Sequence, residues 1–264
     1  MMDVIPFDPR RFKTAAASYL VGRPVYPPRL FRRIVELCGL DRSHRAMDLG
    51  CGPGQIAIAL APYVGRVVAV DPEPEMLKIA AGEAERAGRE IEFVQASSYD
   101  LGPRFGTFRL VAMGRSFHWM DRAETLRRLD AMIEPEGAVA FLHDDHPTVP
   151  DNAWFATFQE IVARHAADDV AKRVRAGRAG HESVLLDSPF RRLERITVFE
   201  RSSIPVDALV LRLRSMSSVA RSRVGDRAED LAAEVREAIT PFARDGLLSE
   251  VIAASALIAS REGP

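Results

Sequence analysis

Short apolar segments alternate with amphipathic ones between residues 45 and 143, in the order typical of a sheet covered by helices. Apolar runs predict strands at 45–49, 66–70, 91–95, 108–113 and 137–142. Apolar residues that recur every three or four positions predict helices at 54–63, 74–87 and 121–133. Because several strands are apolar at nearly every position, helices should cover both faces of the sheet. The pattern predicts an α/β, Rossmann-like, doubly wound and mainly parallel sheet.

The flanking regions are more helical, and they complete a predicted seven-stranded sheet. Two further strands are predicted at 192–199 and 251–259, the second as an antiparallel closing strand in preference to a helix. Helices are predicted at 11–20, from Pro28 onward, at 206–218 and at 226–243. We therefore divide the chain into four parts. These are an N-terminal flap with a first helix (1–44), a ligand-binding core (45–143), a helical insert acting as a substrate lid (144–190), and C-terminal strands and helices that complete the sheet and pocket (191–264).

Composition narrows the environment and the partners. The chain has 264 residues and a formal net charge of -1, which gives no electrostatic case for binding nucleic acid. With only Cys38 and Cys51, a disulfide framework is not expected. The first residues lack the apolar core of a signal peptide, and no apolar run reaches the roughly 20 residues that a membrane helix needs. We expect a cytoplasmic monomer or homodimer without a membrane partner.

A glycine-rich turn follows the first predicted strand of the core. Gly50, Gly52 and Gly54 alternate with other residues, and an apolar helical run begins directly after Gln55. Glycines let a backbone approach a ligand where a Cβ would collide, and the free N–H groups of the helix's first turn point toward that ligand. The turn therefore predicts a ligand site.

Two carboxylates near this turn indicate what the ligand is. Asp71 ends the second strand, 21 residues after Gly50, where folds of this type bind the two hydroxyls of a ribose. It could also cap the helix that starts near Pro72. Asp48 lies two positions before the first glycine, where a carboxylate opposes a pyrophosphate and favours a cationic group. Together these residues point to a nucleoside that carries a positive charge.

The segments Asp48–Gly54 and Val70–Leu77 resemble those of class I S-adenosylmethionine-dependent methyltransferases. The pair His118-Trp119 after the fourth strand adds to this resemblance. The residues Tyr19 to Pro27 resemble, more loosely, the flap of the small-molecule methyltransferases of the type-11 and trans-aconitate-like groups. The resemblance implies an S-adenosylmethionine cofactor and transfer of its methyl group to a small-molecule acceptor by in-line displacement.

The same resemblance implies which residues hold the cofactor. The glycines would line its methionine and ribose portions, and Met76 would pack on the adenine unless it is a core residue. Ser97 stands where the family often carries an acid for the adenine amine, so its hydroxyl or Asp100 must replace that acid. The implied cofactor residues are Tyr19, Arg23, Asp48, Gly50, Cys51, Gly52, Gly54, Gln55, Asp71, Pro72, Met76, Ser97, Ser98, Tyr99, Arg115 and Ser116.

Candidate catalytic residues follow the fourth and fifth strands. His118 is the first candidate for a general base, because an unperturbed imidazole titrates near neutrality, although it could instead shape the ligand site. Trp119 would then form a wall. His143 is an alternative base. His146 could serve in the same way or line the pocket. Arg115 could bind an acidic substrate group, and the expected substrate residues are His118, Trp119, His146 and Trp154.

The sequence also bears on a metal site and on two alternative functions. The run His143–His146 holds metal-ligating residue types, but neighbours on a strand point to opposite faces, so no metal site is expected. A nicotinamide-dependent oxidoreductase would use a glycine spacing that this chain lacks. A non-catalytic, regulatory protein that binds S-adenosylmethionine is the remaining alternative.

Overall fold

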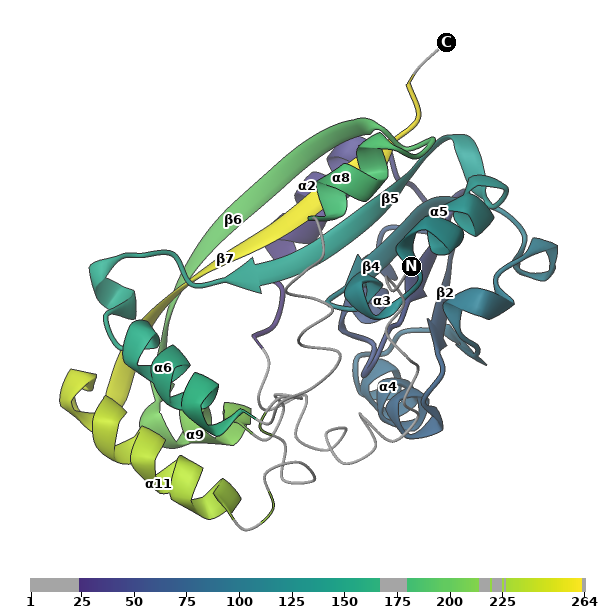
Figure 1. Ribbon diagram of the computed structural model, residues 1–264. Helices are drawn as coiled ribbons and strands as arrows, with labels where there is room; N and C mark the ends of the chain where they lie inside the picture. Colours follow the sequence, from purple (N-terminus) through teal and green to yellow (C-terminus); the bar gives the residue numbers. More distant parts are fainter. Residues whose placement is uncertain (1–23, 167–179, 214–218, 220–224, 226, 263–264) are drawn as a thin grey trace.

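A seven-stranded sheet forms the centre of the computed structural model, which describes residues 24–166, 180–213, 219, 225 and 227–262 (Figure 1). The strands are β1 (Arg45–Leu49), β2 (Arg66–Asp71), β3 (Glu92–Gln95), β4 (Phe108–Gly114), β5 (Ile133–Asp145), β6 (Arg192–Pro205) and β7 (Leu247–Ser260). Their order across the sheet is β3-β2-β1-β4-β5-β7-β6. The predicted mainly parallel, doubly wound α/β sheet is confirmed.

Strand β7 is the antiparallel closing strand that the sequence predicted. It lies between β5 and β6 and pairs antiparallel with both, while the pairs among β1 to β5 are parallel. The strands β5, β6 and β7 are longer than predicted. As a result, β6 and β7 continue together beyond the end of β5 as a two-stranded ribbon (Figure 1).

Helices cover both faces of the sheet. Those described are α2 (Pro28–Cys38), α3 (Gln55–Leu60), α4 (Pro74–Arg86), α5 (Arg122–Asp130), α6 (Phe155–His165), α8 (His181–Leu186), α9 (Val206–Leu213) and α11 (Arg227–Ile239). Helices α2 and α3 pack on one face, against alanines and leucines of the strands. Helices α5 and α8 pack on the other, where Met47, Phe108 and Phe141 are buried.

The first described helix shows how the sequence sets these boundaries. Pro28 begins α2, at a position where the missing N–H is not needed. Leu30, Phe31 and Ile34 form its buried face. Gly39 ends it with a left-handed φ of 58°, a conformation that favours glycine. The predicted helix start at Pro28 is confirmed.

The segment 144–190 divides between two places. Its helix α6 joins α9 and α11 in a separate hydrophobic cluster below the β6–β7 ribbon, whereas α8 packs on the sheet (Figure 1). Trp154 is 1% exposed inside this cluster, and its indole N–H donates to the carbonyl of Ser249 at 2.8 Å. We predicted Trp154 as a substrate contact, but its burial and its satisfied N–H make it a packing residue.

Several predictions concern residues outside the described part of the chain. They are the helix at 11–20 and the cofactor candidates Tyr19 and Arg23. Within the described residues, no helix has both the length and the apolar character needed to cross a membrane.

Candidate functional site

The glycine turn lies where the strand order reverses, between β1 and β4. In open α/β sheets this switch point is where ligands bind, beyond the carboxyl ends of the strands. The backbone N–H groups of Gly50 and Cys51 both donate to the carbonyl of Val70, at 2.7 and 3.0 Å. The turn is therefore fixed to the end of β2 before any ligand arrives.

Each of the three glycines meets a different requirement, although all have φ between 52° and 83°. A Cβ on Gly50 would lie 2.6 Å from the Cβ of Ser116, and one on Gly54 would lie 3.1 Å from that of Ala80. A Cβ on Gly52 would meet no atom of the described residues within 4 Å. Gly50 and Gly54 thus allow close packing inside the protein, and of the three glycines only Gly52 borders space that the described residues leave open.

Asp71 joins the turn to the helix that follows β2. Its Oδ2 accepts from the N–H of Gly52 at 2.8 Å, and its Oδ1 accepts from the N–H of Glu73 at 2.9 Å. Burial raises the pKa of Asp71, while these two hydrogen bonds oppose the increase. Each oxygen retains a second lone pair, so the capping role does not prevent Asp71 from accepting a hydroxyl.

Asp48 places a second carboxylate beneath the turn. It is 1% exposed, and its Oδ2 accepts from the N–H of Ala57 at 2.9 Å. Its Oδ1 has no hydrogen-bond partner among the described residues. Burial raises the pKa of Asp48 to about 7, and the nearby Asp71 adds to the increase. A positive charge at this site would offset both effects.

The predicted adenine side is occupied by contacts within the chain. The N–H and hydroxyl of Ser97 both donate to Oδ2 of Asp100, at 2.8 and 2.7 Å, which caps a short 3₁₀ turn. Met76 is buried, whereas Tyr99 is 48% exposed. The structure thus brings the two proposed replacements for the family's acid together as one hydrogen-bonded pair.

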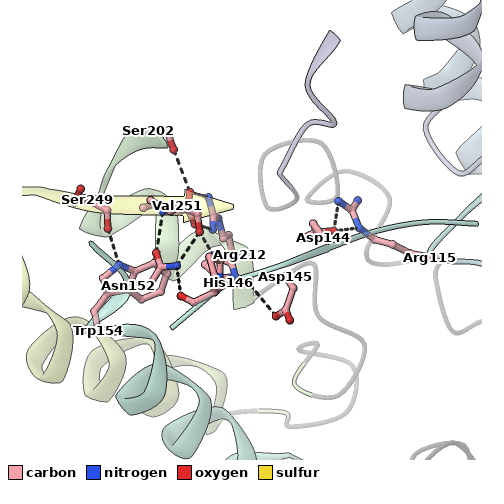
Figure 2. Close-up of polar contacts among 12 residues, drawn as sticks. Arg115, Asp144, Asp145, His146, Asn152, Trp154, Ser202, Arg212, Ser249 and Val251 are labelled. Atoms are coloured by element: carbon pink, nitrogen blue, oxygen red, sulfur yellow. Dashed lines mark hydrogen bonds and ion pairs between the residues drawn. The ribbon is translucent and has the colours of Figure 1, made fainter. Parts of the chain in front are cut away.

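Arg115 forms a structural clamp at the end of β4. It adopts an uncommon φ of 54° for a residue with a side chain. Its guanidinium pairs with Asp144 (Figure 2). It also donates to the carbonyl of Pro24 at 3.0 Å and lies 4.5 Å from the ring centre of Tyr26. The next residue, Ser116, donates to the carbonyl of Leu49 at 2.8 Å. The end of β4 is thus tied to β1, β5 and the segment before α2.

The remaining predicted residues near the turn are placed as follows. Cys51 is buried, and burial raises the pKa of its thiol well above the ordinary value. Gln55 begins α3 and Pro72 follows β2, both partly exposed, and Ser98 is buried. These residues flank the glycine turn or the end of β3, and their contact with a cofactor stays a prediction.

The histidines after β4 and β5 lie in different surroundings. His118 and Trp119 belong to a short 3₁₀ turn, with ring centres 4.8 Å apart. His143 lies on the face of β5 toward α8, where burial and then the charge of Arg195 lower its pKa. Nε2 of His146 lies 2.8 Å from Oε1 of the buried Glu250. Within the described residues, no group of three His, Cys, Asp or Glu side chains could hold a metal ion.

Sequence reasoning missed the partners of these residues. It did not find Asp144 as the partner of Arg115, nor Glu250 and Arg212 beside His146. Glu250 left one signal, because it interrupts the apolar run of the closing strand. A lone acid in a buried strand requires a partner.

A protein-family model matches the region that contains the glycine turn. Residues 46–137 match the family model described as a methyltransferase domain. This segment holds β1 to β4, the glycine turn and Asp71. Over these residues the chain is similar to the methyltransferase-domain family, and the sheet around them has the class I methyltransferase fold.

Curated relatives and solved structures agree with this placement. Methyltransferase pgmE of Aspergillus terreus is 31% identical over 157 residues, 55% of this chain and 46% of the relative. The uncharacterized methyltransferase Rv3342 of Mycobacterium tuberculosis is 25% identical and aligns over 84% of this chain and 85% of its own length. The matches to the first curated relatives span about half of their length.

Two solved structures share the fold over nearly the whole chain. A putative type II methyltransferase from Anaeromyxobacter dehalogenans has a TM-score of 0.63 at 24% identity, covering 90% of this chain and 97% of its own. A methyltransferase from Thiobacillus denitrificans, solved with S-adenosyl-L-homocysteine, has a TM-score of 0.54 at 16% identity, covering 98% and 100%.

Proposed function

We propose that the chain is an S-adenosylmethionine-dependent methyltransferase that acts on a small-molecule acceptor. The observation that carries this proposal is the space that the described residues leave open at Gly52, whose N–H donates to the buried Asp71, with the buried Asp48 close enough to interact with Asp71. Two acids and an alternating glycine turn suit a cationic nucleoside without a phosphate. The methyltransferase names of the relatives, and the S-adenosyl-L-homocysteine in the Thiobacillus structure, support the same cofactor.

The residues of the turn fit this cofactor. Asp71 would accept hydrogen bonds from the ribose hydroxyls, and the carboxylate of Asp48 would offset the positive charge. When bound, S-adenosylmethionine supplies a methyl group on a sulfonium whose leaving group is a neutral thioether. The chain then needs to place the acceptor in line and exclude water. His118 and Trp119, at the end of β4, are proposed as one wall of that space.

Binding measurements test the proposed cofactor. We expect isothermal titration to show that the protein binds S-adenosylhomocysteine, and that Asp71→Asn weakens binding at least about tenfold, equivalent to about 1.4 kcal/mol. The control is Glu136→Gln, which changes an exposed ion pair with Arg109 at the amino end of the sheet. Tighter binding of NADH than of S-adenosylhomocysteine would favour the oxidoreductase alternative and refute the proposal.

Transfer itself is tested with tritiated S-adenosylmethionine and a set of small hydroxyl, thiol and amine acceptors. We expect label to appear in at least one acceptor and to be lost in Asp71→Asn. Binding without transfer to any of them would instead support the regulatory alternative.

A further inference from the structure

Three polar side chains from distant parts of the chain meet beside the end of β5. They are His146, the first residue after β5, and Arg212 of α9, both labelled in Figure 2, together with Glu250 of β7. Glu250 is 1% exposed. Nε2 of His146 lies 2.8 Å from its Oε1, and Arg212 contacts both oxygens, one of them at 2.9 Å. The cofactor proposal gives none of these three residues a role.

The carboxylate of Glu250 fixes which ring nitrogen of His146 carries the proton. Burial alone would raise the pKa of Glu250, but the hydrogen bonds from His146 and Arg212 lower it to about 2. An ionised carboxylate can only accept hydrogen bonds, so Nε2 must be the protonated nitrogen. In the neutral imidazole, Nδ1 then holds a free lone pair. It has no hydrogen-bond partner among the described residues and is not sealed from solvent.

Aromatic contacts hold the imidazole in place. The ring of Phe155 stacks on it with centres 4.0 Å apart and an angle of 19° between the planes. Trp154 contacts it edge-on, with centres 5.5 Å apart. The His146 side chain keeps 10% of its surface exposed. The imidazole is therefore oriented by a carboxylate and by two aromatic rings, with a small part left open.

His146 follows the carboxyl end of β5, and open α/β sheets bind their ligands beyond the carboxyl ends of the strands. Asp144 lies two residues earlier, at the end of β5, so the two residues are roughly 7 Å apart along the chain. Asp144 binds Arg115, and the neighbouring Ser116 lies against Gly50 of the glycine turn. His146 is therefore linked to the proposed cofactor site through the end of β5, the Asp144–Arg115 ion pair and Ser116. Figure 2 shows the Arg115–Asp144 pair and the His146 cluster along the same strand.

A second trio of the same residue types lies at the surface. His165 contacts Glu234 at 2.6 Å, and Arg164 contacts the same carboxylate. The Glu234 side chain is 34% exposed, against 1% for Glu250. Because solvent competes for the exposed carboxylate, that trio lacks the fixed geometry of the buried one. It supplies a matched control.

We propose that His146 is a catalytic residue that accepts the proton of a hydroxyl acceptor, with Glu250 as its positioning residue. This inference rests on the proposed methyltransferase function. The O–H bond of the acceptor breaks, and its proton passes to Nδ1. The oxygen forms a bond to the methyl carbon as the carbon–sulfur bond breaks, and that electron pair remains on the sulfur.

Two phenols that differ in acidity test the proposal. At mildly alkaline pH, 4-methylphenol keeps its proton, whereas 4-nitrophenol is mostly ionised and needs no base. With tritiated S-adenosylmethionine, His146→Gln should lower methylation of 4-methylphenol about a hundredfold and change that of 4-nitrophenol little. The control His165→Gln should leave both rates unchanged. Equal loss with both phenols would indicate a structural role and overturn the proposal.

A spectroscopic measurement tests the positioning by Glu250 without turnover. Nitrogen-15 NMR of the histidine rings should show the Nε2-protonated form of His146 in the wild type, and a mixture of both forms in Glu250→Gln. An Nδ1-protonated wild-type ring would refute the proposal.

The outcomes separate the two proposals. If S-adenosylhomocysteine does not bind, the proposed function fails. If it binds but neither phenol is methylated, the assignment of His146 to a hydroxyl acceptor fails and the cofactor assignment remains. Circular dichroism of each variant checks that it is folded.

Discussion

Asp48 is held in an environment that disfavours its charge. Its only hydrogen bond among the described residues comes from the N–H of Ala57, and its other oxygen is buried without a partner among them. Between its ordinary pKa of 3.8 and its folded-state value of about 7, the folded protein holds a proton that the unfolded chain has released. Stability therefore falls as the pH rises through this interval.

Replacing Asp48 by Asn should remove that pH dependence. Three pH units correspond to roughly 4 kcal/mol at most, so Asp48→Asn should be more stable than the wild type at pH 8 and similar at pH 4. Urea unfolding without ligand at both pH values measures this difference. Asp41→Asn is the control, because hydrogen bonds from Ser43 lower the pKa of that exposed carboxyl. A wild-type stability that rises with pH would contradict the prediction.

Residues with strong local requirements could be predicted from the sequence. Gly50 and Asp71 follow from the order of strand, turn and helix, and both lie at the switch point of the sheet. The sequence could not predict which of the three glycines borders open space. That depends on Ser116, which packs against Gly50, and on Ala80, which packs against Gly54. Asp144 lies 29 residues from Arg115, and Glu250 lies 104 residues from His146. The periodicity of apolar residues cannot predict contacts between residues so far apart in the sequence.

At the scale of elements, a short connection joins the helical cluster to the sheet. Asn152 is buried between β5 and α6. Its amide donates to the carbonyls of Pro147 and Val251, both at 2.8 Å, and its Oδ1 accepts from the N–H of Val251 at 2.9 Å. One side chain thus fixes the chain leaving β5 against the centre of β7 (Figure 2).

Asn152→Ala should destabilise the protein by about 2–3 kcal/mol, because it leaves buried backbone groups of Val251 and Pro147 without partners. The neighbouring Asp151→Asn should cost less than about 1 kcal/mol, since its contacts with Arg201 and Ser249 lie near solvent. Thermal unfolding followed by circular dichroism compares the two variants. Equal losses would show that Asn152 does not anchor this segment.

The periodicity of the sequence predicted the helices and strands better than it predicted which of them pack together. Apolar strands and amphipathic helices were placed within a few residues, because burial on two faces or on one face determines each pattern. The association of α6 with α9 and α11 could not be derived. Each of these helices has an apolar face, but the apolar pattern does not specify which helix it will pack against.

At the scale of the whole molecule, β7 holds the C-terminal half of the sheet together. Ala256 is fully buried, and it is paired with Leu142 of β5 on one side and with Ile196 of β6 on the other. A break at this position therefore separates β6 and its helices from the core.

Ala256→Pro should prevent folding, because proline removes a ladder hydrogen bond and is not tolerated in a central strand. Ala256→Gly should cost only about 1 kcal/mol, since it keeps the hydrogen bond and loses only a methyl group and backbone rigidity. The soluble yield and the circular dichroism of both variants check this. A well-folded proline variant would refute the assigned pairing.

The position of β7 also affects how the chain is made. A ribosome synthesises β5 and β6 before β7, yet β5 and β6 do not pair with each other, because β7 lies between them in the sheet. Until residues 247–260 emerge, β6 has no strand beside it and the buried Glu250 has not reached His146 and Arg212. A nascent chain that has completed β1 to β4 and their glycine turn therefore still lacks the proposed proton acceptor. Cofactor binding and catalysis would be acquired at different moments of synthesis.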